Sequence, residues 1–319
     1  MNTYKWLLKR EFWEHKGGFF WAPAIASAIY LFFSVIGSFV VHAGLQHTQH
    51  NGHDVNMGTL AAQVSDPAHA SDLANALQAI FQIVSAPPLI VAVFVVFFYC
   101  LGCLFDERKD RSLLFWKSLP VSDGQTVASK VISAMLVAPL IAVTIAVATG
   151  LLFFMLTSAF VVAHGASAMP LWNIGSIAAG IANMVLSIPM WALWALPTVG
   201  WLMLCSSFAS RVPFLWAVLS PVLLGAIVAI VNVMPWFGLT NEWYWANIPG
   251  RLLGGLVPGI ELLYRHANVS VNGPQDLARV LSLGNSYAGM ANPQLWIGAL
   301  VGAAMILGAL RIRKYRAED

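Results

Sequence analysis

The chain has 319 residues, of which 59% are hydrophobic and only 10% are charged, and its mean hydropathy is +0.73. Because charged residues make up about 25% of an ordinary soluble domain, this composition excludes such a domain and indicates an all-α integral membrane protein. The formal net charge of +3 comes from basic residues spread over several segments, so we expect no nucleic-acid partner.

Apolar runs recur along the chain, each long enough to cross the roughly 30 Å hydrocarbon core of a bilayer. They predict a single transmembrane domain over 1–319 with membrane-spanning helices near 19–43, 79–104, 131–157, 177–206, 214–234 and 294–311. The first run is longer than the roughly 7–15-residue core of a signal peptide, and no small-residue cleavage site follows it, so we expect it to be retained. The runs carry no Asp, Glu, Lys or Arg before their terminal residues, which argues against a proton relay.

The distribution of Lys and Arg predicts the topology. If both termini are cytoplasmic, every Lys and Arg lies in an inner segment except Arg251, Arg265 and Arg279, which share one outer segment. The first two outer loops then contain no Lys or Arg at all. The positive-inside rule therefore places both termini on the cytoplasmic side of the cell (inner) membrane.

The segment 1–18 predicts an amphipathic helix that enters the bilayer from its inner surface. Its apolar residues recur at helical spacing, and its lysines occupy another arc. The apolar set is Tyr4, Leu7, Leu8 and Phe12, and the lysines are Lys5, Lys9 and Lys16. Trp6 and Trp13 fall a heptad apart, away from the apolar stripe, and either dock on a partner or anchor at the membrane interface.

Two groups of residues could in principle bind a metal ion. His47, His50 and His53 lie in the polar first outer loop, but short His-rich tracts are more often solvated loop than metal sites. Cys100 and Cys103 lie one helical turn apart in the second span without a second ligand pair, which favours packing in the membrane over metal binding. We therefore expect no metal in this chain.

The outer segment 235–293 is long and mixed in character. Trp236, Trp243, Tyr244 and Trp245 cluster near its start, as an interfacial aromatic belt would. The apolar stretch from Ile248 to Leu263 is interrupted by Gly and Pro, so it is too broken for a full span. It predicts a pair of re-entrant or interface-lying helices. Gly273-Pro274 then opens a second short helix that ends near Leu283.

The densest charge cluster of the chain, Asp106 to Arg111, lies in the first inner loop. Its spacing predicts a solvated helical turn with local ion pairing. The run Leu113 to Trp116 follows, and an isolated protein would avoid exposing such a run to water. Pro120 ends this short cytoplasmic helix, and a capping-box pattern at Ser122 and Gln125 starts the helix that leads into the third span.

This loop resembles the first cytoplasmic loop of the ABC-2 family of transporter permeases. That loop runs from Glu-Arg through an apolar helix to Leu-Pro-Val-Ser, with a Lys at the head of the third span. The corresponding residues here are Glu107-Arg108, Leu113 to Trp116, Leu119-Pro120-Val121-Ser122 and Lys130. The six-span layout, the amphipathic entry helix, the short inner loop Ser206 to Pro213 and the broken outer segment extend the resemblance over the whole chain. Arg111-Ser112 departs from it, because many members carry Gly-Thr there.

The resemblance implies that the segment 106–120 is a coupling helix, which docks into a groove on a separate nucleotide-binding subunit. The implied coupling residues are Glu107, Arg108, Leu113, Leu114, Phe115, Trp116, Leu119 and Pro120. The working complex would contain two such ATPases and a second permease, either another copy of this chain or a homologous one. ATP and Mg would bind to the partner, because this sequence contains no Gly-x4-Gly-Lys-Ser/Thr phosphate loop.

The same resemblance implies that the second and fifth spans line the transport path, with the first and fifth spans meeting across the dimer. The Pro87-Pro88 pair predicts a kink in the second span, because it removes two backbone donors. Ser85, Pro87 and Pro88 are therefore the candidate pathway residues, and ordinary helix packing is the alternative explanation for each. The neutral spans fit an amphipathic or apolar cargo better than a small ion.

Two other classes of function are weighed against the exporter permease. A secondary transporter or channel would work without ATP, but the lack of charges within the spans and the apolar run in the inner loop both weigh against it. An enzyme embedded in the membrane would need a nucleophile, an acid pair or a metal cluster at membrane depth. The sequence contains no such arrangement, so we do not expect the chain to be catalytic by itself.

Overall fold

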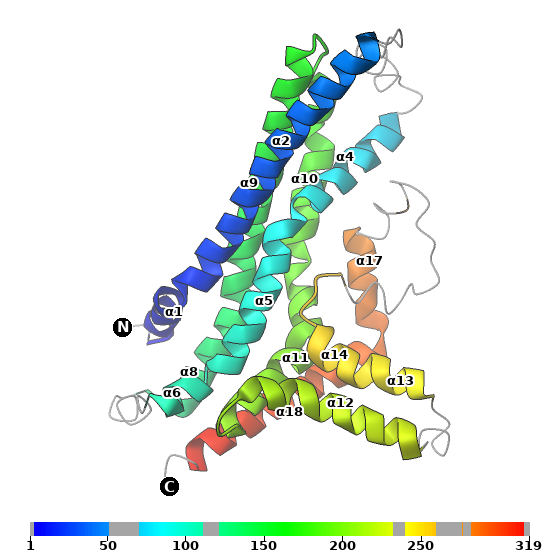
Figure 1. Ribbon diagram of the computed structural model, residues 1–319. Coiled ribbons are helices and arrows are strands. Elements are labelled where there is room, and N and C mark those ends of the chain that lie inside the picture. The colour runs from blue at the N-terminus through cyan, green and yellow to red at the C-terminus, as the bar shows by residue number, and fades with distance from the viewer. Residues whose placement is uncertain are drawn as a thin grey trace.

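The computed structural model describes residues 3–50, 70–110, 121–231, 240–259, 276 and 282–315, with only the backbone described for 45–50 and 70. Over these ranges the chain is helical and contains no strand (Figure 1). The longer helices are α1 (Thr3–Glu14), α2 (Ala22–His50), α4 (Ala70–Val84), α5 (Ala86–Gly102), α8 (Asp123–Ile132), α9 (Ala138–Ala163), α10 (Ile174–Leu186), α11 (Ile188–Phe208), α12 (Pro213–Val231) and α18 (Pro293–Tyr315). The short ones are η1 (Gly17–Trp21), α6 (Phe105–Lys109), η3 (Ser133–Val137), η4 (Met169–Trp172), α13 (Asn241–Trp245), η6 (Ala246–Gly250), α14 (Arg251–Gly254), α17 (Leu283–Tyr287) and η7 (Ala288–Ala291).

Six helical stretches of the described chain are long and apolar enough to cross a membrane. They are Gly17–Gly44, Ser71–Lys109, Asp123–Ala163, Ile174–Phe208, Pro213–Val231 and Pro293–Tyr315. The prediction of an all-α chain with six potential membrane-spanning helices is thus confirmed. The helices of the first two spans reach further than predicted: α2 continues to His50 and α4 begins at Ala70, both inside the expected first outer loop. Ala and Leu dominate the start of α4, and Asp72 favours its first turn.

Two of the six stretches are interrupted near a proline. α4 gives way to α5 at Ser85, just before Pro87-Pro88, and α10 gives way to α11 at Ser187, just before Pro189. A proline has no backbone N–H for the carbonyl four residues earlier, so the helix bends or breaks at that point. The second span is interrupted at the position where a kink is predicted, and the fourth span has a similar interruption.

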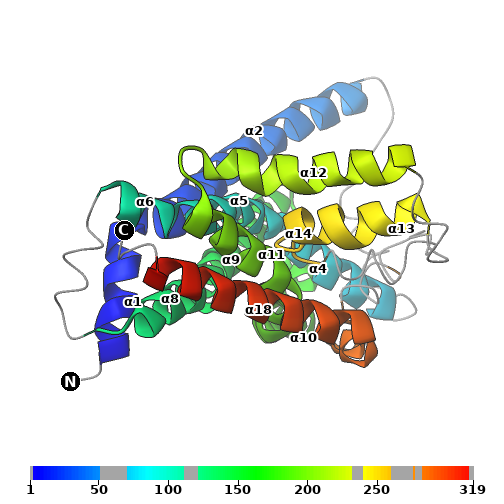
Figure 2. The same ribbon diagram turned by 90° about the horizontal axis from the view of Figure 1, so that it is seen from below.

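Helix α11 lies at the centre of the packing, with α18, α12 and the stretch α13–α14 arranged around it (Figure 2). The approach of α11 to α18 depends on Gly200 and Gly302. A Cβ atom on Gly302 would lie 2.5 Å from the backbone carbonyl of Leu196, and one on Gly200 would overlap the Gly302 carbonyl oxygen. Neither backbone can move aside easily, so the two helices pack this closely only with glycine at both positions.

The outer segment packs back against the helices. The stretch α13–η6–α14 lies along α11 and α12, where Tyr244 is buried while Trp243 and Trp245 are exposed. Thr198 of α11 donates a hydrogen bond to the carbonyl of Arg251, at 2.7 Å. The Arg251 side chain is buried over the ring of Trp194, with its guanidinium carbon 4.3 Å from the ring centroid. The second short helix predicted from Gly273 lies mostly outside the described residues.

The segments expected to share the inner side meet at one end of the molecule. Helices α1, α6 and α8 and the C-terminal end of α18 lie together there (Figure 1). Arg108 of α6 also bonds to the end of α11, which precedes the turn into α12. The charge-based topology requires these ends to lie on one side, and their arrangement agrees with that requirement.

Candidate functional site

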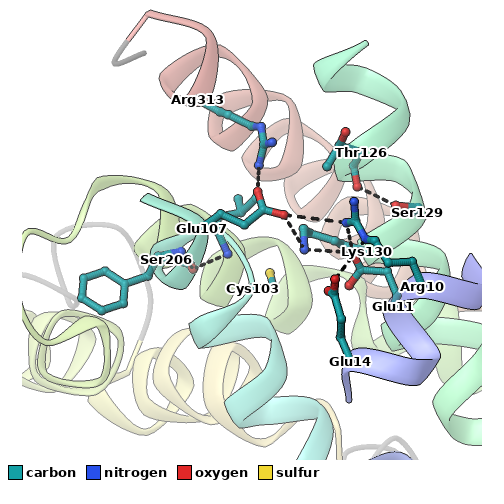
Figure 3. Close-up of polar contacts among 12 residues, drawn as sticks. Arg10, Glu11, Glu14, Cys103, Glu107, Thr126, Ser129, Lys130, Ser206 and Arg313 are labelled. Carbon is teal, nitrogen blue, oxygen red and sulfur yellow. Dashed lines mark hydrogen bonds and ion pairs between the residues drawn. The ribbon is translucent and has the colours of Figure 1, made fainter. Parts of the chain in front are cut away.

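A cluster of charged side chains occupies this common end (Figure 3). It joins four helices that are far apart in the sequence: α1, α6, α8 and α18. We call it the charge cluster, and its members are Arg10, Glu11, Glu107, Asp123, Lys130 and Arg313. The α6 member, Glu107, lies at the base of the first inner loop, so the cluster connects that loop to three other helices.

Lys130 is the centre of the charge cluster. Its ammonium nitrogen lies 3.0 Å from a carboxylate oxygen of Glu11 and 3.0 Å from one of Glu107. The side chains of Lys130 and Glu11 are 2% and 0% exposed, so both charges are removed from water. Tyr99 of α5 donates its hydroxyl to the other Glu11 oxygen at 2.7 Å. Buried charges persist only when paired and hydrogen-bonded in this way.

Two arginines complete the charge cluster from opposite sides. Arg313 of α18 pairs with Glu107 through one nitrogen and with Asp123 of α8 through another, at 3.1 Å. Arg10 of α1 lies 2.6 Å from Glu11 and 3.8 Å from Glu107. The six members therefore carry three positive and three negative charges, and this balance compensates for their removal from water.

The Glu11 carboxyl has a perturbed pKa because two opposed effects act on it. Burial alone raises its pKa, but the nearby Lys130, the Tyr99 hydroxyl and Arg10 together outweigh burial and leave the pKa below its ordinary value of 4.5. Glu11 is therefore ionised at neutral pH in the folded protein. Its pairing with Lys130 is then fully formed.

The lowered pKa of Glu11 makes the stability of the folded protein depend on pH. Above pH 4.5 Glu11 is ionised in both the folded and unfolded states, so its stabilising contribution is complete. As the pH falls below that value, the unfolded state binds the proton first, and the contribution is lost through the lower pKa of the folded state. We expect the unfolding midpoint in detergent to fall more steeply below this pH for the wild type than for Glu11→Gln. If the unfolding midpoint falls equally steeply with pH in both proteins, the ion pairing of Glu11 does not stabilise the fold.

Arg108 connects α6 to the end of α11 through hydrogen bonds. Its guanidinium donates hydrogen bonds to the carbonyls of Ser206 and Ala209, at 2.6 and 3.0 Å. The Ser206 hydroxyl accepts from the backbone N–H groups of Leu104 and Phe105, at 3.1 and 3.0 Å. These bonds satisfy carbonyl groups near the C-terminus of α11 and N–H groups at the N-terminus of α6, which their own helices leave unpaired.

We expect Arg108→Ala to loosen α6 and to destabilise the protein by about 1–3 kcal/mol, because the buried Ser206 and Ala209 carbonyls lose a charged donor. Arg108→Lys should retain part of this stability, since lysine keeps the charge but cannot present the same planar fork. Thermal unfolding of the two variants, together with protease cleavage within 105–110, measures the effect. An Arg108→Ala variant that is as stable and as protease-resistant as the wild type would show that these hydrogen bonds do not hold α6 against α11.

The predicted coupling residues divide into two groups. Glu107 and Arg108 lie in α6, and the expected solvated turn is wrong for both, because their charged groups pair with other helices inside the chain. The remaining predicted coupling residues lie outside the described part of the chain: Leu113, Leu114, Phe115, Trp116, Leu119 and Pro120. The capping box is confirmed: the Ser122 hydroxyl accepts from the Gln125 N–H and the Gln125 side chain from the Ser122 N–H.

The predicted pathway residues lie beside a cavity of about 310 Å³ but do not line it. Ser85 is fully buried, and its hydroxyl faces Gly150 of α9. Pro88 is buried and Pro87 half-buried. Their neighbours Ala86 and Leu89 line the cavity instead.

The candidate metal ligands give no metal site among the described side chains. Cys100 and Cys103 are buried and free, and Cys103 Sγ donates to the Cys100 carbonyl at 3.4 Å. His47 and His50 lie in α2, where only the backbone is described, and His53 lies outside the described residues. A different group, Glu11 with Glu14 and His15, has the spacing of metal ligands. The pairing of Glu11 with Arg10 and Lys130 already neutralises its charge.

The sequence does not predict four members of the charge cluster as site residues: Arg10, Glu11, Asp123 and Arg313. A signal for Glu11 is nevertheless present in the spacing, because it falls four residues after Leu7 on the same stripe of α1. Leu7 and Glu11 are the two buried residues of that helix. An acid on an otherwise apolar stripe indicates a buried basic partner, and Lys130 is that partner.

Comparison of the chain with models of known protein families, with curated proteins and with solved structures finds no match.

Proposed function

We propose that this chain is the permease subunit of an ATP-binding cassette exporter of the ABC-2 type. In this proposal a separate subunit binds ATP and Mg and hydrolyses the ATP, and the chain itself is not an enzyme. It moves an amphipathic or apolar cargo out of the cytoplasm. The similarity of the first inner loop to that family is the basis of the proposal, and the six potential membrane spans are compatible with it.

The charge cluster is the structural observation that supports the proposal. A motor that acts on the loop 106–120 must transmit its movement to the membrane helices, and Glu107 stands at the start of that loop. Through Lys130 and Arg313, Glu107 is tied to α8 and α18, and through Glu11 the network includes α1. Movement of the loop would therefore displace several helices together instead of bending one connection. Because buried ion pairs are costly to separate, the unit would move as a rigid body.

As a mechanism, ATP binding would close the two partner subunits, and their closure would move the loop 106–120 with α6. Arg108 would carry this movement to the end of α11, and the charge cluster would carry it to α1, α8 and α18. ATP can drive this change only through its higher affinity for the closed state. A path for cargo would then open between two permease copies.

The proposed orientation puts the charge cluster on the cytoplasmic side of the cell membrane, with both termini on that side. The positive-inside bias of the sequence supports this placement. On the opposite side the stretch α13–η6–α14 would form a re-entrant helix. Thr198 and Trp191 of α11 support it, because they bond to the backbone carbonyls of Arg251 and Leu256.

A second permease, either another copy or a homologous chain, would pack against the first and fifth spans. These two are the least buried of the six: within an apolar window of 18 residues, 6% are buried in Gly17–Gly44 and 17% in Pro213–Val231, against 22% to 44% in the others. Lipid would cover whatever part of these faces the second permease leaves free. Closed twofold assemblies are the commonest arrangement for such subunits.

The proposal is tested by purifying the chain from its native membranes in mild detergent and measuring bound ATPase. The variant Leu114→Asp/Trp116→Asp puts charge into the apolar part of the loop. We expect it to retain about tenfold less ATPase than the wild type, because buried charge at an interface core is strongly unfavourable. Lys109→Ala/Asp110→Ala, at exposed positions of the same loop, is the matched control and should retain the partner. Absence of ATPase from every preparation would favour an ATP-independent transporter or channel.

A further inference from the structure

A cavity of about 310 Å³ lies among the second, third and fourth spans. Its walls come from α4–α5, α9 and α10–α11, and Pro258, Gly259 and Ser286 of the outer segment close one side. Among the residues that the structure describes, no Asp, Glu, Lys or Arg lines it. It is separate from the charge cluster, and none of its lining residues belongs to that cluster.

The two proline-linked interruptions both lie at this cavity. Ile83 and Ala86 line it on either side of the α4–α5 break, and Ser187 lies at the α10–α11 break itself. Each break leaves backbone carbonyls that a continuous helix would have paired. The polar part of the wall, Gln82, Asn183, Ser187 and Ser286, gathers around these breaks.

The cavity changes character along α5. From the polar region at Gln82 the wall continues through Leu89 and Val93 to Val96, and it is apolar there on the α9 side as well, with Pro139 and Val143. At 1.5 Å per residue, the stretch from Gln82 to Val96 corresponds to about 21 Å along the helix axis. The cavity is therefore amphipathic along its length, with polar groups near one end.

Gln82 provides the most specific indication of a ligand. Its side-chain nitrogen is buried and has no hydrogen-bond partner among the residues that the structure describes. A buried N–H donor without an acceptor is unfavourable, and native structures rarely leave one unsatisfied. A ligand that brings a carbonyl oxygen to this end of the cavity would satisfy the donor once the Gln82 side chain rotates to expose its nitrogen.

We propose that this cavity binds one acyl chain of a membrane lipid, with the ester carbonyl of that chain at Gln82. The apolar wall from Leu89 to Val96 suits a hydrocarbon chain, and the uncharged lining leaves the charged headgroup outside. The volume is near the lower limit for small-molecule sites, which fits a single chain rather than a whole lipid. The cavity lies among helices apolar enough to cross a bilayer, so a lipid is the ligand with direct access.

The test is photolabelling of the purified full chain by a phospholipid with a photoreactive group in its acyl chain. Labelled peptides should map to the cavity wall, within 82–96, 139–143 and 183–191. Ala92→Trp fills the cavity and should lower this labelling at least fivefold. Ile90→Trp, two residues away on an exposed face of α5, is the matched control and should label like the wild type. Thermal unfolding of both variants checks that they are folded.

A second measurement tests the role of Gln82. Unlabelled ester phospholipid should compete with the probe about fivefold better than the corresponding ether lipid, as expected for one net hydrogen bond. Gln82→Leu should remove this preference while retaining the labelling. Labelling that stays unchanged in a folded Ala92→Trp variant, or an ester preference that survives in Gln82→Leu, would overturn the proposal, as would displacement of the probe by an apolar peptide but not by ester lipid. Binding requires no ATPase, so its failure would leave the proposed permease function unaffected.

Discussion

Replacing Lys130 with methionine is expected to lower the free energy of unfolding by about 3–5 kcal/mol. The substitution removes the cation that lies 3.0 Å from both Glu11 and Glu107. Among the described residues, it leaves the buried Glu11 carboxylate paired with one cation, Arg10, and hydrogen-bonded to Tyr99. Denaturant or thermal unfolding in detergent measures the loss. Lys314→Met, which removes an exposed lysine from α18, is the matched control and should change stability by less than about 0.5 kcal/mol.

A double-mutant cycle distinguishes the ion pairing of Glu11 with Lys130 from the packing of the Lys130 side chain. Glu11→Gln/Lys130→Met removes both charges, so its loss of stability should be smaller than the sum of the two single losses by at least about 1 kcal/mol. Simple additivity would mean that Lys130 stabilises the fold by packing alone. In that event the charge cluster would not be the mechanical unit that the proposed function requires.

Gly302→Ala is expected to destabilise the protein by about 1–3 kcal/mol although it adds a single methyl group. That methyl would lie 2.5 Å from the carbonyl group of Leu196 and 2.6 Å from the nitrogen of Pro197, so α18 would have to move away from α11. Thermal unfolding gives the size of the effect.

Gly308→Ala on the same helix is the matched control. Its added methyl would meet only the end of the Leu204 side chain, at 3.4 Å. We expect this variant to be as stable as the wild type or more stable, because alanine favours a helix by about 1 kcal/mol over glycine. Equal stability of Gly302→Ala and Gly308→Ala would contradict the close packing of α11 on α18.

The parts of the fold that the sequence predicts well depend on local chemistry. Six potential spans follow from the length of the apolar runs, and the kink before Pro87-Pro88 follows from the missing backbone donors. The helix start at Ser122 follows from the capping box. Each of these features is determined by residues within a few positions of one another, so a single sequence is enough to find them.

The parts that the sequence does not predict depend on which helices meet. Glu107 was expected to lie in a solvated turn, because its local neighbours are charged. Its partners Lys130 and Arg313 are distant in the chain, and no spacing within the loop indicates them. The burial of Arg251 over Trp194 is likewise absent from the local sequence, because it depends on how α14 packs on α11. The cavity beside Gln82 likewise arises only where three spans come together.

The central claim, that this chain is a transport subunit driven by a separate ATPase, is tested most directly by native mass spectrometry of the complex extracted from its own membranes. We expect a particle that contains two permease chains, either two copies of this 34.6 kDa chain or one copy with a homologue, and two copies of a polypeptide with a phosphate-binding loop. The same particle should hydrolyse ATP. A particle that contains this chain alone and hydrolyses no ATP would contradict the proposed permease function.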